Sequence, residues 1–265
     1  MYDEALARLS KIDPTGELVA TYNIALADRR PRVVGALNDT LLLGYWRLPF
    51  SPEVRQGGVT RDSVFLVPLT LQGAPTGDSI GPLASSEYVV LPQRNGMSVA
   101  TRAFGKGLRT AIADNRIAVG TQDAFTVSIY SYAGDLVRSV RLRRANPVVD
   151  ESDIARYKED WIGDIRDPRQ APHDFELMNA MTYPHEWPAH GSIEFDAIGN
   201  LWVRRPTTYR DSQPAWEVFD TSGVWLGSAA VPLRFGVFEI GRDYLLGRWR
   251  DQDDVEHVRL YELGR

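Results

Sequence analysis

Short runs of alternating hydrophobic and polar residues cover most of the chain, and turn-forming residues separate them. Such alternation is typical of β-strands with one buried face. Between the runs, a glycine repeatedly follows three small or turn-prone residues, and glycine adopts the positive φ that tight hairpin connections require. We therefore expect five hairpin tips, at IDPTGELV (12–19), LTLQGAPT (69–76), YSYAGDLV (130–137), FDAIGNLW (195–202) and FDTSGVWL (219–226).

A second series of turns is interleaved with the first. Its members place Asn-Asp, Asp-Asn or Gly-Arg-Asp between two β-rich runs, in VVGALNDTLLLGYW (33–46), LRTAIADNRIAVGT (108–121) and FGVFEIGRDYLLGRW (235–249). The order gives an A–B hairpin followed by a C–D hairpin in each unit, which is typical of the four-stranded blades of β-propellers. In this scheme residues 191–206 form the A–B hairpin of one blade, with Trp202 and Val203 on strand B.

The predicted fold is an all-β β-propeller of four-stranded antiparallel blades, forming a single domain over residues 1–265. Residues 8–24 supply a C–D hairpin, three whole units follow, and the C-terminal segment supplies three strands. Because these strands fall short of six complete blades, we expect a six-bladed type that lacks an N-terminal portion. A four-bladed ring is the alternative, and it requires residues 17–24 to serve as the last blade's D strand.

The segment DESDIARYKEDWIGDIRDP (150–168) departs from the β pattern. Asp150 is suited to cap a helix, Asp153 follows three residues later, and Pro168 lies beyond the expected end. A second, shorter helix is expected over residues 172–181, so a helical insertion at about 150–181 would cross between two blades. The amphipathic spacing is carried by Ile154, Tyr157, Trp161 and Ile165.

Composition narrows the functional classes. The 265 residues carry a net charge of −5, which gives no general case for binding nucleic acid. The absence of cysteine excludes disulfides, thiolate catalysis and cysteine-ligated zinc. No apolar run is long enough to span a membrane. The opening MYDEALARLSKID has early charges and no apolar core, so we do not expect a signal peptide there, and the compartment stays open.

Three motifs in the C-terminal part carry a resemblance. They are D-x-x-G-x-L-W-V, W-x-V-F-D-x-x-G and a closing V-x-L-Y-x-L strand. Over about residues 100–265 the chain resembles an uncharacterised bacterial family of six-bladed, NHL-like β-propeller proteins. The resemblance implies a fold and no particular activity; family members commonly have an export signal and a longer N-terminus. The matching residues are Asp196, Gly199, Leu201, Trp202, Val203, Trp216, Val218, Phe219, Asp220, Gly223, Val258, Leu260, Tyr261 and Leu263.

Known catalytic motifs fit poorly. HEWPAH (185–190) has its two histidines five residues apart, whereas the zinc motif H-E-x-x-H needs one helical turn between them, and Pro188 would break the helix. FGKGLRT (104–110) lacks the third glycine of a phosphate-binding loop, so we expect a loop that enters a strand. No G-x-S-x-G elbow occurs. His190 remains of interest because it precedes a strand A and could face the channel mouth.

Charge separates by face in the predicted propeller. The hairpin tips on one face carry acids: Asp13, Glu17, Asp39, Asp114, Asp135, Asp196, Asp220 and Asp243. The opposite face carries bases: Arg30, Arg32, Arg47, Arg102, Lys106, Arg109, Arg204, Arg205, Arg210, Arg234 and Arg250. Guanidinium groups that converge in a funnel attract anions and pair with carboxylate or phosphate. The candidate ligand-binding residues are Arg32, Arg109, His190, Arg204, Arg205, Arg234 and Arg250.

The predicted fold and its charge pattern support two functions. The first is a non-catalytic binding or scaffold module whose basic loop face takes a small anionic ligand or a protein partner, without a cofactor, nucleic acid or membrane span. The alternative is a metal-dependent hydrolase of the lactonase or gluconolactonase type, which holds a divalent cation with carboxylate and amide oxygens at the channel mouth. Only Glu186 and Asp123 are acids near the right face, so the sequence favours the binding module.

Overall fold

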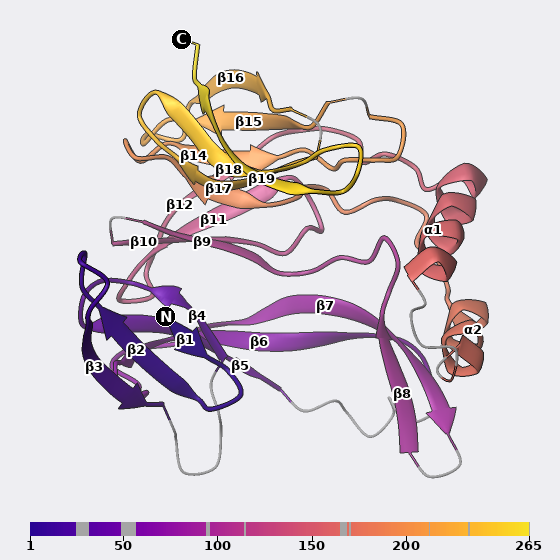
Figure 1. Cartoon of the computed structure of the whole chain (residues 1–265), viewed down its shortest axis with the longest axis horizontal. Helices are drawn as coiled ribbons and strands as arrows, with labels where there is room; N and C mark the ends of the chain where they lie inside the picture. The colour runs from indigo at the N-terminus through magenta and orange to yellow at the C-terminus, as the bar shows by residue number, and fades with distance from the viewer. Residues whose placement is uncertain are drawn as a thin grey trace.

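The computed structural model describes residues 1–24, 32–48, 57–93, 96–113, 115–164, 169, 171–211, 213–232 and 234–264. Within these ranges the chain forms 19 strands and two helices. The strands make five antiparallel sheets, and each sheet is built from strands that follow one another in the sequence. The protein is therefore all-β with a propeller-like succession of sheets (Figure 1).

The five sheets have clear boundaries. The first contains β1 (Tyr2–Asp3), β2 (Arg8–Ile12) and β3 (Leu18–Asn23). The second contains β4 (Arg32–Ala36), β5 (Leu41–Arg47), β6 (Gly58–Thr70), β7 (Ile80–Gln93) and β8 (Gly96–Thr101). The third contains β9 (Arg109–Ala113), β10 (Arg116–Gly120), β11 (Thr126–Ser131) and β12 (Leu136–Arg141).

The fourth sheet contains β13 (Ile193–Phe195), β14 (Leu201–Arg204), β15 (Ala215–Phe219) and β16 (Trp225–Ala230). The last contains β17 (Phe235–Ile240), β18 (Tyr244–Arg250) and β19 (Glu256–Glu262). The A–B hairpin predicted at residues 191–206 is thus β13–β14, with Trp202 and Val203 on the second strand. The three C-terminal strands are also confirmed.

All five glycine turns have the predicted conformation, with positive φ at each glycine. In FDAIGNLW, Gly199 has φ 85° and its N–H donates to the carbonyl of Asp196 at 3.0 Å. The Asp196 carboxylate also accepts from the backbone N–H groups of Ile198 and Asn200, at 3.0 and 2.8 Å. Asp13 and Asp220 make equivalent contacts in their own turns. The carboxylates of these three aspartates stabilise the turns by accepting hydrogen bonds from backbone N–H groups. This local role explains why these acids lie at the hairpin tips.

Apolar clusters join each sheet to the next one along the chain. Ile24, Leu42 and Leu69 lie between the first and second sheets, while Leu43, Leu66 and Ile117 join the second to the third. The third packs on the fourth through Val127, Val140, Ile193, Leu201, Val203 and Phe219. The fourth packs on the last through Trp202, Trp216, Val218, Phe235, Ile240 and Leu245. Strands β9 and β13 lie side by side, as the first strands of neighbouring blades do.

Two details differ from the predicted four-stranded pattern. The second sheet has five strands, because β6 and β7 are unusually long and β8 pairs with the outer part of β7. Strand β3 pairs with β2, so residues 17–24 do not serve as the D strand of the C-terminal sheet. The sheets show a propeller-like series, and they establish neither the six-bladed type nor the four-bladed alternative.

The helical insertion is confirmed as α1 (Glu151–Asp164) and α2 (Ala171–Ala180). Asp150 caps α1 as predicted: its carboxylate accepts from the backbone N–H groups of Ser152 and Asp153 at 2.9 and 3.0 Å. Pro168, the expected end signal, and Ile165, the last residue of the amphipathic spacing, lie outside the described residues. Figure 1 shows both helices on one side of the stacked sheets, near the ends of β7 and β8. No helix in the described ranges is long and apolar enough to cross a membrane.

Candidate functional site

A pocket of about 570 Å³ opens between the third and fourth sheets, at the strand ends where β9 begins and β14 ends. Its lining contains two arginines and no aspartate or glutamate. The surrounding groups are hydroxyl, amide and aromatic side chains with two prolines. The lining residues are Arg109, Gln122, Trp187, Pro188, His190, Gly191, Ser192, Arg204, Pro206, Thr207, Thr208 and Tyr209.

Arg109 and Arg204 give the pocket its charge. Among the described residues, neither guanidinium has a carboxylate within ion-pair distance, and Arg204 Nε is buried without a hydrogen-bond partner. Arg109 Nη1 donates only a long hydrogen bond, at 3.3 Å, to the carbonyl of Leu108. Desolvation lowers the pKa of both arginines. Arg109 is exposed to solvent and Arg204 is half-buried, so the cost of a charge without a counter-charge falls mainly on Arg204, and an anion in the pocket would relieve it.

Arginines at equivalent positions in other sheets are neutralised. Arg47 ends β5, the second strand of its sheet, and its Nε lies 2.7 Å from the Asp62 carboxylate on the next strand. Arg250 ends β18, again a second strand, and its Nη2 lies 2.7 Å from the Glu256 carboxylate on β19. In these two sheets, therefore, the arginine that ends the second strand has an acid on the third strand.

The fourth sheet omits that acid. Arg204 ends β14 in the same way, but the residue opposite it on β15 is Trp216, and Pro214 lies two residues earlier. Trp216 is buried in the core between the fourth and last sheets. Glu217, the nearest acid along β15, is engaged by Arg205. Within the described part of the chain, Arg204 therefore has no acid to pair with.

His190 supports the pocket wall. It is fully buried and packs edge-on against Phe125, with ring centroids 6.0 Å apart. Its Nδ1 lies 2.9 Å from the Gly191 carbonyl, which makes Nδ1 the donor. The ring occupies the space beside Gly120, where an added Cβ would lie 2.5 Å from it. Burial, with a contribution from Arg109, lowers the pKa of His190, so the imidazole is neutral and the pocket's charge comes from the arginines.

Gln122 ties three segments together at the base of the pocket. Its amide group donates to the carbonyl of His190 and accepts from the N–H of Gly107 at 2.7 Å. Its own carbonyl accepts from the N–H of Ala189 at 3.0 Å. Gln122 is buried and has φ 64°, a strained conformation for a residue other than glycine. Strained residues concentrate at functional sites, where the surrounding structure holds them in place.

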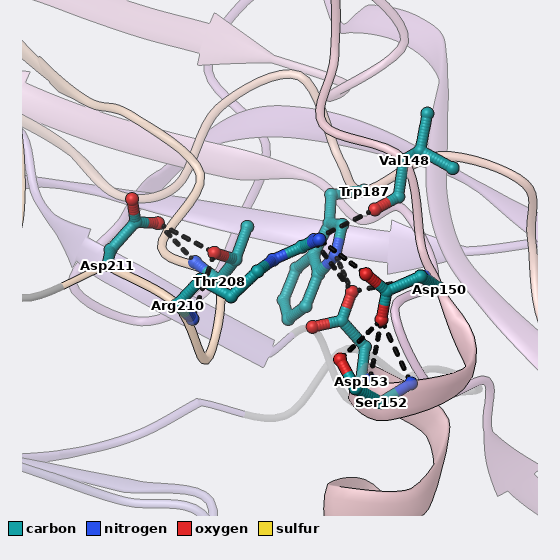
Figure 2. Close-up of polar contacts among 8 residues, drawn as sticks. All are labelled: Val148, Asp150, Ser152, Asp153, Trp187, Thr208, Arg210 and Asp211. Atoms are coloured by element: carbon teal, nitrogen blue, oxygen red, sulfur yellow. Dashed lines mark hydrogen bonds and ion pairs between the residues drawn. The ribbon is translucent and has the colours of Figure 1, made fainter.

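Helix α1 holds the pocket's outer wall through Arg210 (Figure 2). Arg210 donates from Nη1 to Asp150 at 2.5 Å and from Nη2 to Asp153 at 2.9 Å, and Nη2 also reaches the carbonyl of Val148 at 3.1 Å. The same Asp153 carboxylate accepts from the indole N–H of Trp187 at 3.2 Å. These contacts therefore hold together the N-terminus of α1, the loop before β15 and the aromatic wall of the pocket, which Trp187 and Tyr209 form.

The other predicted ligand-binding residues do not face this pocket. Arg32 pairs with Glu4 at 3.0 Å, and Arg205 pairs with the buried carboxylate of Glu217. Arg250 pairs with Glu256, and Arg234 donates to the carbonyl of Asp251 at 2.9 Å. The structure thus brings together Arg109, His190 and Arg204 from the predicted set and separates the remaining four.

The predicted basic face is also largely neutralised. Besides the arginines already described, Arg102 pairs with Glu87 at 3.0 Å and Lys106 with Asp123 at 3.2 Å. The sequence pattern overlooked Glu87 and did not pair Asp123 with Lys106, because each acid lies far along the chain from its base. Arg30 of the basic set and Asp114 of the acidic set lie outside the described residues.

Sequence reasoning missed Gln122, Trp187 and Tyr209. No sequence pattern pointed to Gln122, because its positive φ depends on tertiary contacts and glutamine does not favour that conformation. Trp187 lies inside HEWPAH, where the histidines drew attention. Tyr209 precedes Arg210 in a loop, and only the contact with α1 shows why the pair matters.

The acids considered for a metal site are already engaged. Asp123 binds Arg61 and Lys106, at 2.7 and 3.2 Å, and Glu186 accepts from the Asn146 amide at 3.1 Å. Within the residues that the structure describes, no group of three or more histidine, aspartate or glutamate side chains gathers to hold a metal ion.

Comparisons with known proteins found only solved structures of low sequence identity. Neither the family models nor the curated proteins gave a match. Among solved structures, a DUF4221 family member from Bacteroides vulgatus is 12% identical over 98% of this chain and 74% of its own, with a TM-score of 0.48. Hsv2 from Kluyveromyces lactis is 10% identical over 93% and 76%, with a TM-score of 0.32. BamB from Moraxella catarrhalis is 10% identical over 97% and 70%, with a TM-score of 0.29.

Proposed function

We propose that this protein is a non-catalytic binding module that takes a small anionic ligand in the pocket between the third and fourth sheets. The observation that carries the proposal is a pair of arginines, the exposed Arg109 and the half-buried Arg204, that line a pocket without any acid. Burial in a low-dielectric pocket strengthens a charge-assisted contact, and guanidinium matches carboxylate geometry. The contrast with Arg47 and Arg250, which have their own acids, supports an external partner for Arg204.

Titration calorimetry tests this directly. Acetate, inorganic phosphate, benzoate and 1-naphthoate are titrated into the whole chain in the presence of a chelator, since the proposal needs no metal. We expect at least one anion to bind, and Arg109→Met or Arg204→Met to weaken it about ten- to a hundredfold, because each removes a charge-assisted contact worth roughly 1.5–3 kcal/mol. Arg8→Met, the same change at an exposed strand position, is the matched control and leaves affinity unchanged.

Two outcomes contradict the proposal. One is the absence of binding by all four anions. The other is binding that Arg109→Met and Arg204→Met leave unaltered, because the ligand would then lie elsewhere. A signal that disappears in chelator and returns with calcium or manganese would instead favour the metal-dependent hydrolase.

We further propose that the sheets belong to a six-bladed, NHL-like propeller. The consecutive order of the sheets and the adjacency of β9 and β13 support this geometry, since first strands of neighbouring blades meet around a propeller axis. A crystal structure in which the chain closes with four blades would overturn it.

A further inference from the structure

We infer that the anion bound here carries an aromatic ring, so that the ligand is a small aromatic carboxylic acid. This inference rests on the proposed function and adds a ligand class to it. The pocket is two-sided: Arg109 and Arg204 form a cationic side, and Trp187 and Tyr209 bring aromatic rings to the same space. A volume of about 570 Å³ lies within the range of small-molecule sites.

The polar atom of Trp187 is already occupied, because its indole N–H donates to Asp153 on α1 (Figure 2). Burial and the nearby Asp160 carboxylate raise the pKa of the Tyr209 hydroxyl. Both residues offer the surface of their rings to a ligand. Tyr209 is 45% exposed, so its ring is available without rearrangement.

A third ring fixes the other two. Phe104 lies 4.6 Å from Trp187 and 6.5 Å from Tyr209, measured between ring centroids, and the latter two are 6.1 Å apart in an edge-on arrangement. Phe104 has φ 53°, which is rare for a bulky residue. A strained phenylalanine behind the wall indicates that the ring positions are held for a purpose beyond packing alone.

Two polar side chains of the pocket have little left to offer a carbohydrate, while the Thr207 hydroxyl and His190 Nε2 are buried without a partner among the described residues. A sugar needs many hydrogen-bonding partners, but both polar atoms of the Gln122 side chain are engaged within the protein. The Thr208 hydroxyl donates to Asp211 at 3.0 Å, and its own oxygen accepts from the N–H of Arg210 at 3.2 Å. A flat aromatic acid can place its ring against Trp187 and Tyr209 and its carboxylate against Arg109 and Arg204.

The test compares acids of equal charge. Calorimetry on the whole chain is run with 1-naphthoate, benzoate, cyclohexanecarboxylate and acetate at one ionic strength. We expect 1-naphthoate to bind at least tenfold more tightly than cyclohexanecarboxylate, which has no π face. Tyr209→Leu removes the exposed ring and should weaken 1-naphthoate about five- to tenfold while leaving acetate unchanged. Tyr209→Phe keeps the ring and is the matched control.

The outcomes separate the two proposals. If cyclohexanecarboxylate binds as well as 1-naphthoate and Tyr209→Leu changes neither, the ring inference is wrong and the anion site stands. If 1-naphthoate binds and responds to Tyr209→Leu but not to Arg204→Met, the aromatic wall stands and the anion site is wrong. Failure of every acid to bind overturns both. Circular dichroism and the urea midpoint of each variant confirm that the fold is retained.

Discussion

Glu194 is a carboxyl group on β13 without an ion pair or hydrogen bond among the described residues, half-buried one residue beyond Ile193. Desolvation raises its pKa from 4.5 to about 7. Between these two pH values the folded state keeps the proton that the unfolded state has released. The folded state therefore binds more protons, and this group's contribution to stability declines as the pH rises from about 4.5 through 7.

Glu194→Gln should remove this pH dependence. At pH 8 the variant should be more stable than the parent by roughly 2 kcal/mol, because a neutral amide replaces a desolvated carboxylate. At pH 4.5 the difference should nearly vanish. Urea unfolding at both values measures the effect, with Glu262→Gln on exposed β19 as control. Equal changes at the two pH values would show that the pKa of Glu194 is not raised in the folded protein.

At the scale of elements, the pocket wall depends on the contact between α1 and the loop that contains Arg210. That contact combines two carboxylates, one of them the buried Asp153, with the helix cap at Asp150. The helix N-terminus also favours negative charge at this position. Removing the guanidinium leaves the buried Asp153 carboxylate without a cation and with two hydrogen bonds, from the Trp187 indole N–H and the Asp150 backbone N–H, each at 3.2 Å.

Arg210→Met should loosen α1 and the aromatic wall together. We expect faster amide hydrogen exchange in α1 and in residues 185–190, and a destabilisation of about 1–3 kcal/mol from the uncompensated carboxylate. Arg8→Met is the control, since Arg8 lies at an exposed position of β2 in the first sheet and away from α1. Exchange that rises equally in both variants would mean that the helix is held by its apolar contacts instead.

Elements with local causes were predictable from the sequence. The glycine turns, the capped helix and the β13–β14 hairpin each follow from residues a few positions apart. The fifth strand of the second sheet was not, because β8 depends on the length of β6 and β7. Within the site, Arg109 and Arg204 were predicted for their charge. Their significance depends on which arginines lack acids, and that is decided by contacts such as Arg205 with Glu217.

At the scale of the molecule, the sheets differ in how they are covered. The third sheet is packed on both faces, against the second through Ile117 and against the fourth through Val127. In the described part of the chain β19 pairs only with β18, and its Val258 and Leu260 are 73% and 60% exposed. Regions with fewer buried contacts open more readily.

Amide hydrogen exchange of the whole chain should therefore be slowest in β10 and β11 and fastest, among the strands, in β19. The expected difference is at least a hundredfold in exchange rate, because β19 opens locally while the central strands need global unfolding. Exchange followed by mass spectrometry, at two protein concentrations, measures it. Protection of β19 equal to that of β11 would show that its free edge is covered in solution.

The helical insertion enters the chain between β12 and β13, at a junction between sheets, and interrupts no strand pairing. It contributes the rim of a pocket whose floor belongs to the sheets. Its sequence can therefore diversify, lengthen or shorten without disturbing the register of the β-structure. Evolution, or a protein engineer, can treat α1 and α2 as an exchangeable part: the scaffold persists while the repertoire of molecules it recognises changes.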